Sequence, residues 1–184
     1  MKFPFLRSKH KKSPEAPEKT REKKPLKNAL VSLLIKLFAV FAVIWLVLTF
    51  VFGIYRMSGN NMYPALRDGD LCVTYKLETY HSGDVVAYRA DGKVRLGRII
   101  AIAGDTVDSE GDTVMLNGLR SSEDIFYPTQ LADTNLTLPY TLGEDEFLVL
   151  NDYRSDMNDS RTYGMITKDA LKGKVIFFFR RRGF

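Results

Sequence analysis

The residues that could do chemistry start with the segment Ser-Gly-Asn-Asn-Met-Tyr-Pro-Ala-Leu, residues 58–66, in which Ser58 is the only aliphatic hydroxyl. A serine attacks a carbonyl only when a neighbouring base takes its proton. The chain has two histidines, His10 and His81, which argues against a Ser-His-Asp triad and against a histidine-based metal site. The one cysteine, Cys72, alternates with apolar neighbours, which predicts a buried and inert thiol. We therefore expect no metal and no cofactor.

Strands must position these residues, because the spacing of apolar side chains from residue 71 onward is mostly two and not the roughly 3.6 of a helix. The expected strands are 71–77, 84–90, 94–104, 113–120, 145–152 and 172–181. Asp91-Gly92 and Asn117-Gly118 are typical of the turns between paired strands. A short turn is expected at Thr167–Leu171, and the polar segment 121–141 is expected to be a surface excursion. The predicted fold class is mainly β, with coiled antiparallel β-sheets or a small barrel behind one N-terminal transmembrane helix.

The N-terminal third divides by composition into a basic tail and an apolar run. Residues 1–28 contain ten Lys and Arg, three Glu and four prolines, and their few apolar residues predict a disordered tail. Residues 29–55 follow, and their uncharged stretch 37–55 is long enough to cross a bilayer as a helix. A cleavable signal peptide is the competing interpretation, but no small-x-small site follows the run. The positive-inside rule then places residues 1–28 in the cytosol and the domain of residues 56–184 outside the cell membrane.

The net charge of +5 belongs to the tail and not to the predicted β domain. Because basic residues outnumber acidic ones strongly within 1–28, residues 29–184 carry a small net negative charge. A nucleic-acid-binding domain would need a basic patch on its own surface. The sequence therefore argues against nucleic acid as a partner.

Four sequence blocks resemble, in order and spacing, those of bacterial type I signal peptidases, serine protease family S26. The blocks are SGNNMYPALRDGDLCV (58–73), similar to G-x-S-M-x-P-T-L with a following Gly-Asp; SGDVVAY (82–88), similar to R-G-D-I-V-x-F; GRIIAIAGDTV (97–107), similar to K-R-V-I-G-x-P-G-D-x-V; and LNDYRSDMNDSRTYG (150–164), similar to G-D-N-R-x-x-S-x-D-S-R-x-x-G. The resemblance covers nearly all of residues 29–184. It implies a signal-peptidase-like fold.

The family's chemistry uses a serine that attacks the scissile carbonyl and a lysine, kept neutral by burial, that accepts its proton. The resemblance places the nucleophile at Asn61, the base at Gly97 and a lysine-orienting serine at Met157, so all three catalytic side chains are replaced. It therefore implies that no catalytic residue remains. Because the missing lysine would leave space beside Asn61, we expect the flexible Met157 to fill it and to make the site dry and apolar.

The resemblance also marks a peptide-binding groove, because active relatives hold their substrate as an extended strand. The candidate groove residues are Ser58, Gly59, Asn60, Asn61, Met62, Tyr63, Pro64, Arg95 and Gly97. Structural support is expected from Asp105, Asp159, Ser160 and Arg161. Milder departures from the family pattern put the fine shape of the groove in doubt; they are Ala65, Ala101, Ala103, Asn151 and Tyr153.

The leading hypothesis is a non-catalytic, signal-peptidase-like membrane protein, a pseudoenzyme that binds exported polypeptide. A non-catalytic branch of the family in Gram-positive bacteria is tied to sortase-built pili. The resemblance to that branch implies a role in sortase-dependent pilus assembly at the cell surface, with a major pilin and a sortase as partners.

Two alternatives remain open. An active type I signal peptidase, a serine endopeptidase that removes signal peptides, could use a displaced nucleophile such as Ser58. Lys93 lies too far along the expected strand to serve as its base, and Arg95 is always charged. A structural scaffold could instead hold partners through the aromatic strand Val175–Phe179, for which a core strand with a solvated end is the simpler interpretation.

Overall fold

The computed structural model describes residues 26–122, 125, 127–131 and 134–180. The chain divides into two units, Met1–Ala42 and Val43–Phe184, and each is described by itself. Most of the expected disordered tail, residues 1–25, lies outside the described residues.

The N-terminal helix α1, Leu26–Val51, has a different extent from the predicted anchor of residues 29–55. It begins three residues earlier, and Phe52–Tyr55 belong to strand β1 instead of the helix. Its 26 residues correspond to about 39 Å at about 1.5 Å per residue, more than the roughly 30 Å of a bilayer core. Its side chains are almost all exposed, and α1 is long and apolar enough to cross a membrane.

The C-terminal end of α1 is tied to the β domain by one lysine. No basic residue occurs in the last turn of the helix. Lys76 instead donates from its backbone N to the Val51 carbonyl at 2.9 Å and from Nζ to the Thr49 carbonyl at 2.8 Å. A cation at this end satisfies free carbonyls and complements the helix dipole.

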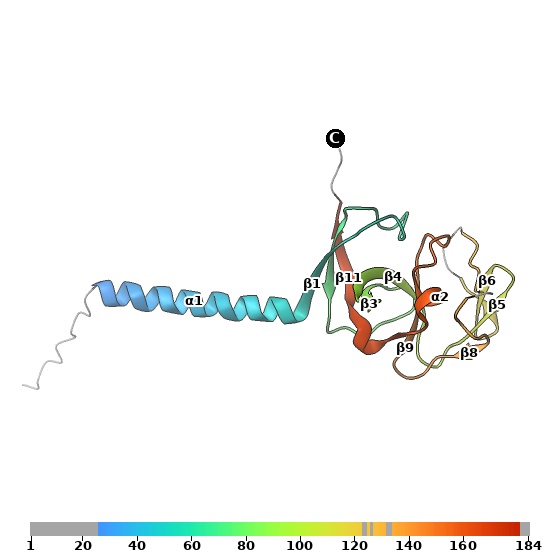
Figure 1. Cartoon of the computed structure of the whole chain (residues 1–184). Coiled ribbons are helices and arrows are strands. Elements are labelled where there is room, and N and C mark those ends of the chain that lie inside the picture. Colours follow the sequence, from blue (N-terminus) through green and yellow to red (C-terminus); the bar gives the residue numbers. More distant parts are fainter. Residues whose placement is uncertain (1–25, 123–124, 126, 132–133, 181–184) are drawn as a thin grey trace, which may run out of the picture. The chain divides into compact units, whose positions relative to one another are not determined.

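Two antiparallel sheets make up the β domain (Figure 1). Among the described residues, the larger sheet has the order β1 (Phe52–Arg56), β2 (Leu71–Tyr75), β11 (Leu171–Phe179), β3 (Val85–Ala90), β4 (Lys93–Ala101), β9 (Glu146–Leu150) and β10 (Ile166–Thr167). The smaller sheet has the order β7 (Leu119–Arg120), β6 (Thr113–Leu116), β5 (Thr106–Glu110) and β8 (Tyr140–Thr141). A short helix, α2 (Ser160–Tyr163), and a 3-10 turn, Lys168–Ala170, complete the described elements. The predicted class of coiled antiparallel sheets behind one apolar helix is confirmed.

Two of the predicted hairpin turns have the expected backbone geometry. Asp91 and Gly92 join β3 to β4 with φ values of 49° and 69°, and Asn117 and Gly118 join β6 to β7 with φ values of 52° and 78°. Successive positive φ values are typical of type I′ turns, whose twist matches that of paired strands. These turns fix the register of each hairpin.

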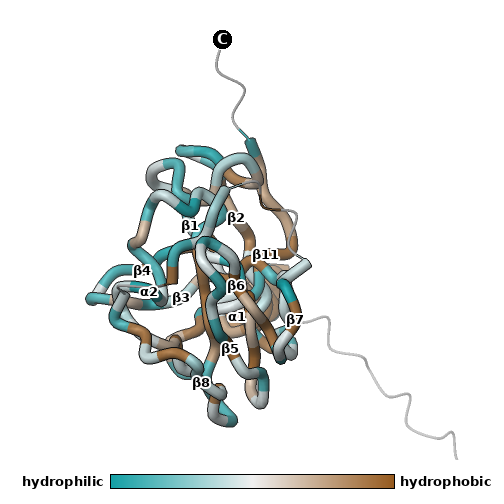
Figure 2. The backbone as a smooth tube through the Cα atoms, turned by 90° about the vertical axis from the view of Figure 1, so that its right-hand side faces the viewer, coloured by the Kyte–Doolittle hydropathy of each residue, from teal (hydrophilic) through white to brown (hydrophobic). Residues whose placement is uncertain are grey.

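Among the residues that the structure describes, three groups of buried apolar side chains form the core. One of them lies beneath the segment 58–66 and joins it to the larger sheet; its buried members are Met57, Met62, Leu66, Cys72, Ala87 and Leu96. Cys72 is fully buried as predicted, and burial, followed by the charge of Asp70, raises the pKa of its thiol to about 11. The brown stretches of the tube in Figure 2 lie largely in strands, whereas many connecting loops are teal or white.

The aromatic end of strand β11 does not lie in the core, contrary to the prediction. The segment Ile176–Phe179 is exposed, with Phe177 and Phe179 showing 53% and 56% of their surface to solvent. Only the first part of the strand is buried, where Gly173 has a φ of 130° and a Cβ there would meet the Tyr75 carbonyl at 2.8 Å. The strand was predicted correctly, and its burial was not.

Candidate functional site

The segment 58–66 is held as a closed loop by hydrogen bonds at its base. The Met57 N donates to the Asp70 carbonyl at 2.8 Å, and the Gly69 N donates to the Met57 carbonyl at 3.0 Å. Within the loop, Gly59 N donates to the Asp68 carboxylate at 2.8 Å. Met62 is fully buried and anchors the loop in the core. The loop therefore presents Asn61 in a fixed position.

The C-terminal end of β11 holds the same loop from the other side. Arg180 donates from Nη2 to the Asp70 carboxylate at 2.8 Å and to the Ala65 carbonyl at 3.1 Å. The Asp70 side chain is only 2% exposed, and its hydrogen bond with Arg180 holds the pKa of that carboxyl below its usual value. This contact links strand β11 to the loop that carries Asn61.

Asn61 is engaged on its backbone and on its side chain. Its Nδ2 donates to the Leu96 carbonyl at 3.2 Å and to Asn151 Oδ1 at 2.9 Å. Its own carbonyl accepts from Tyr153 N at 2.9 Å. An amide is not a nucleophile, and both N–H bonds of this one are used in holding β4 and the loop after β9 together. Asn61 therefore acts as a structural connector.

A buried ion pair supports Asn151 from below. Arg161 donates from Nε and Nη2 to the two oxygens of Asp159 at 2.9 and 2.7 Å, and both side chains are essentially inaccessible. Asp159 Oδ2 also accepts from Asn151 N at 2.9 Å. Ser160 Oγ accepts from Val149 N at 3.0 Å. Asp159, Ser160 and Arg161 therefore contact one another and the end of β9, and their supporting role stays a prediction.

Gly97, where the resemblance places the family's lysine, has no room for a side chain. A Cβ built there would lie 2.6 Å from Val149 Cγ1 and 3.0 Å from Tyr88 Cε1. Real Cβ atoms essentially never approach another heavy atom closer than 3.0 Å, and Val149 and Tyr88 are both fully buried. The space that a lysine stem would need is therefore occupied by these two side chains.

The prediction that Met157 fills this space is wrong. Met157 is 38% exposed, and its carbonyl accepts from Thr162 Oγ1. The closing side chains are Val149 and Tyr88, because both project from strands that pair with β4 beside Gly97. The Tyr88 hydroxyl has no hydrogen-bond partner among the described residues, and burial raises the pKa of its phenol, so it stays protonated and is no substitute base.

A cavity of about 400 Å³ lies beside Asn61 and is lined mainly by polar residues. Its walls come from β1 and the following loop on one side and from the start of β4 on the other; the lining residues are Tyr55, Arg56, Met57, Ser58, Gly59, Asn60, Asn61, Lys93, Val94, Arg95, Leu96, Asp156 and Asn158. Of the candidate groove residues, Met62, Tyr63, Pro64 and Gly97 do not line it. The expected dry, apolar site is therefore not what the structure shows.

A second depression opens on the other side of Asn60. It has a volume of about 410 Å³ and is lined by Asn60, Tyr63, Arg67, Tyr127 and Tyr153. Tyr127 and Tyr153 meet edge to face at 5.2 Å, and the Arg67 guanidinium lies 5.6 Å from the Tyr63 ring centre. Asn60 thus lines both the groove beside Asn61 and this aromatic pocket.

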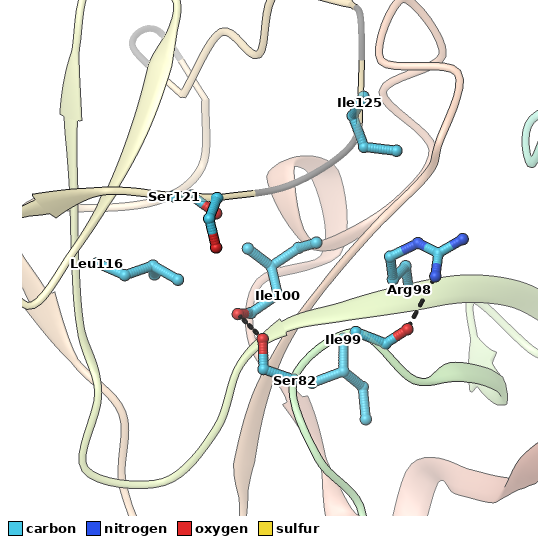
Figure 3. A pocket seen from close by; sticks show the side chains of 9 residues that line it. Ser82, Arg98, Ile99, Ile100, Leu116, Ser121 and Ile125 are labelled. Atoms are coloured by element: carbon cyan, nitrogen blue, oxygen red, sulfur yellow. Dashed lines mark hydrogen bonds between the residues drawn. The ribbon is translucent and has the colours of Figure 1, made fainter.

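A larger cavity of about 530 Å³ lies apart from Asn61 (Figure 3). Ser82 Oγ donates there to the Ile100 carbonyl and Arg98 Nη1 to the Gly83 carbonyl, each at 2.8 Å. Asp105, expected to support the site, instead accepts from Ile102 N at 3.0 Å and from Asn117 Nδ2 at 2.9 Å, and so holds the turn between β4 and β5. Neither feature contributes to the groove at Asn61.

Sequence reasoning missed the importance of Asn151 and Val149. The resemblance places a Gly of the family at Asn151, and Asn151 Oδ1 accepts from the Asn61 amide. The joint occurrence of two unexpected asparagines, Asn61 and Asn151, was a usable signal. The role of Val149 had no signal in the sequence, because an apolar residue in a strand is the ordinary expectation there.

Comparisons with known proteins agree with this architecture. The model of the family described as signal peptidase, peptidase S26, matches residues 30–180. Signal peptidase IB of Staphylococcus aureus is 30% identical over 176 residues, covering 84% of this chain and 91% of the relative. Signal peptidase I of Bacillus caldolyticus is 31% identical over 145 residues, covering 70% of this chain and 79% of the relative.

A solved structure of a signal peptidase I from Enterococcus faecalis is also similar, with 26% identity and a TM-score of 0.47 over 53% of this chain and 97% of that chain. The chain combines an N-terminal helix long and apolar enough to cross a membrane with antiparallel sheets that form a groove at the loop 58–66. Because the family model covers most of its length, the chain belongs to the signal peptidase family, peptidase S26.

Replacing Arg161 by Ala is expected to lower the free energy of unfolding by about 3–5 kcal/mol, because it leaves the buried Asp159 carboxylate without its counter-charge. The free energy of unfolding is measured by urea denaturation of the full chain in detergent, with the far-UV circular dichroism of the β strands as the signal. Arg89→Ala, at an exposed position of β3, is the control and should change the value by less than about 0.5 kcal/mol. Equal effects of the two changes would contradict the supporting role of the pair.

Replacing Gly97 by Ala is expected to destabilise the domain by about 1–3 kcal/mol, because the added methyl group overlaps Val149. Val149→Ala alone is expected to cost about 1–3 kcal/mol through the cavity that it leaves. The double variant should lose at least about 1 kcal/mol less free energy of unfolding than the sum of the two single losses, because the new methyl group fills part of that cavity. Strict additivity in a double-mutant cycle would mean that Val149 does not block position 97.

Proposed function

We propose that this member of the signal peptidase family binds exported polypeptide as an extended strand and does not cut it. The observation that carries the proposal is the occupied space at Gly97, where a lysine base would have to stand. The amide of Asn61, held by Leu96 and Asn151, replaces the nucleophile. Loss of either member of a serine–lysine dyad removes the shared proton-transfer step, and here both are absent.

The edge of β4 supports strand binding without the catalytic side chains. Lys93–Gly97 pair with β3 on one side, whereas β9 pairs with β4 only from Arg98 onward. Leu96 directs its carbonyl away from β3, toward Asn61. By the alternation of an antiparallel ladder, Val94 directs its N–H and carbonyl the same way, into the groove. A bound peptide would extend the sheet at this free edge through main-chain hydrogen bonds.

We further propose the cellular setting implied by the family resemblance. The helix α1 anchors the chain once in the cell membrane, with residues 1–28 in the cytosol and the β domain outside. The partner is an exported protein, with a major pilin held for a sortase as the specific hypothesis. That hypothesis depends on the resemblance to the non-catalytic Gram-positive branch and on the replaced residues Asn61, Gly97 and Met157.

An active peptidase with a displaced nucleophile is the first competing function. Ser58 and Lys93 do line the same cavity. Lys93 is exposed to solvent, however, and a lysine base depends on burial for its neutral form. The second competing function is a scaffold that binds partners through β11. The exposure of Ile176–Phe179 favours this function over the interpretation of β11 as a core strand.

A cleavage assay tests the absence of chemistry. The chain in liposomes is expected to leave a preprotein intact under conditions in which an active signal peptidase cleaves it. Asn61→Ser with Gly97→Lys is expected to remain inactive, because Val149 and Tyr88 exclude the lysine stem from its place. Cleavage that Ser58→Ala abolishes would establish the displaced nucleophile, and cleavage by the double variant would show that position 97 accommodates a lysine after all.

Site-specific crosslinking separates groove binding from scaffold binding. A photoreactive residue replacing Val94 is expected to capture an exported polypeptide in cells, because Val94 borders the groove and is 41% exposed. The same residue at Phe178, which is also 41% exposed, is the matched control on β11. Capture from Phe178 alone would contradict groove binding and would show that partners bind at the aromatic end of β11.

A further inference from the structure

The groove beside Asn61 carries positive charge that the protein itself does not neutralise. Arg56, Lys93 and Arg95 line it, and Asp156 is the one acidic residue among its described lining residues. In the described part of the chain, the ion pairs involve other residues and none of these three cations. Asp156 keeps its negative charge although its Oδ1 accepts from Asn158 N at 2.9 Å and from Asn158 Nδ2 at 2.7 Å. It therefore offsets one of the three cations, and an excess of positive charge remains in the lining.

Arg95 is the best positioned of the three cations. Its guanidinium lies 4.9 Å from the ring centre of Tyr163, so stacking restricts where the charge can go. Its Nε is buried without a hydrogen-bond partner among the described residues. A buried donor of this kind costs free energy until an acceptor arrives. A guanidinium takes a carboxylate best, because two parallel N–H groups match its two oxygens.

The cations stand beside a free strand edge, which defines the shape of the ligand. Arg95 belongs to the same stretch of β4 as Val94, whose main-chain groups face the groove, and Arg56 lies across the cavity on β1. A peptide added at this edge would direct alternate side chains to opposite faces, about 7 Å apart on each face. Carboxylates at alternate positions would then follow one face of the bound strand.

We propose that the groove selects acidic polypeptide: an extended segment whose alternate residues are Asp or Glu, one of which pairs with Arg95. This inference rests on the proposed strand binding and names its substrate class. The main-chain hydrogen bonds to the β4 edge provide sequence-independent binding, and Arg56, Lys93 and Arg95 provide the selection by charge. The proposal does not depend on the direction in which the bound segment runs past Asn60, because the three cations select acidic side chains in either direction.

The test compares two fluorescein-labelled peptides that differ only in charge, Thr-Glu-Ala-Glu-Thr-Glu-Ala and the same peptide with Gln for every Glu. Binding to the full chain in uncharged detergent micelles is measured by fluorescence anisotropy at low and high salt. The acidic peptide is expected to bind about tenfold or more tightly, and its advantage is expected to shrink as salt screens the cations. Arg95→Gln should remove most of that advantage and leave the Gln peptide unaffected.

Two further variants keep the test decisive. Arg95→Lys retains the charge and should retain part of the preference for the acidic peptide. A variant that misfolds is recognised because it loses binding to both peptides. Arg120→Gln, on the exposed strand β7, removes a positive charge elsewhere and should change nothing. Equal affinity for the two peptides, or a preference that survives Arg95→Gln, would overturn the selection by charge and leave strand binding intact. Failure of both peptides to bind would overturn the proposed function as well.

Discussion

The buried pair of Asp159 and Arg161 is the contact on which the candidate site depends. Because Asp159 accepts from the backbone of Asn151 while it neutralises Arg161, one carboxylate positions the whole loop after β9. Asn151 then accepts from Asn61, and Asn61 donates onward to Leu96 of β4. The buried Asp159–Arg161 pair therefore fixes the position of the residues that form the walls of the groove beside Asn61. Two ions buried together are seldom a gain in stability over apolar residues, so their value here lies in the geometry that they impose.

Binding and chemistry are separable in this architecture. Hydrolysis would require a nucleophile at Asn61 and a neutral amine at Gly97, whereas strand addition requires only the free main-chain groups of β4 beyond its pairing with β9. The retained loop 58–66 still closes one side of the groove through Met62 and the base hydrogen bonds of Met57. The proposed strand binding therefore uses none of the side chains that serine–lysine chemistry would need.

Sequence reasoning predicted what depends on local pattern. The period-two alternation located β2, β3, β4, β9 and β11, and the Asp-Gly and Asn-Gly dipeptides located two hairpins. It misplaced the end of the helix, because the apolar stretch Phe52–Tyr55 fits a membrane helix as well as it fits a strand, and only pairing with β2 decides between them. It named positions 61 and 97 by resemblance, but it assigned the space beside them to Met157, whereas Val149 and Tyr88 are the side chains that lie against Gly97. That error was unavoidable from sequence alone, because the neighbours of Gly97 come from β3 and β9, which are distant along the chain.

The packing around Gly97 also has a historical meaning. A serine restored at position 61 has no base, and a lysine restored at position 97 meets Val149 and Tyr88, so neither change by itself gives a functional intermediate. Selection acts on one substitution at a time and has nothing to favour along that path. Under the proposal that peptidase chemistry is lost, the packing around Gly97 makes that loss a one-way step, and the groove is free to change to suit its ligands without pressure to preserve an active centre.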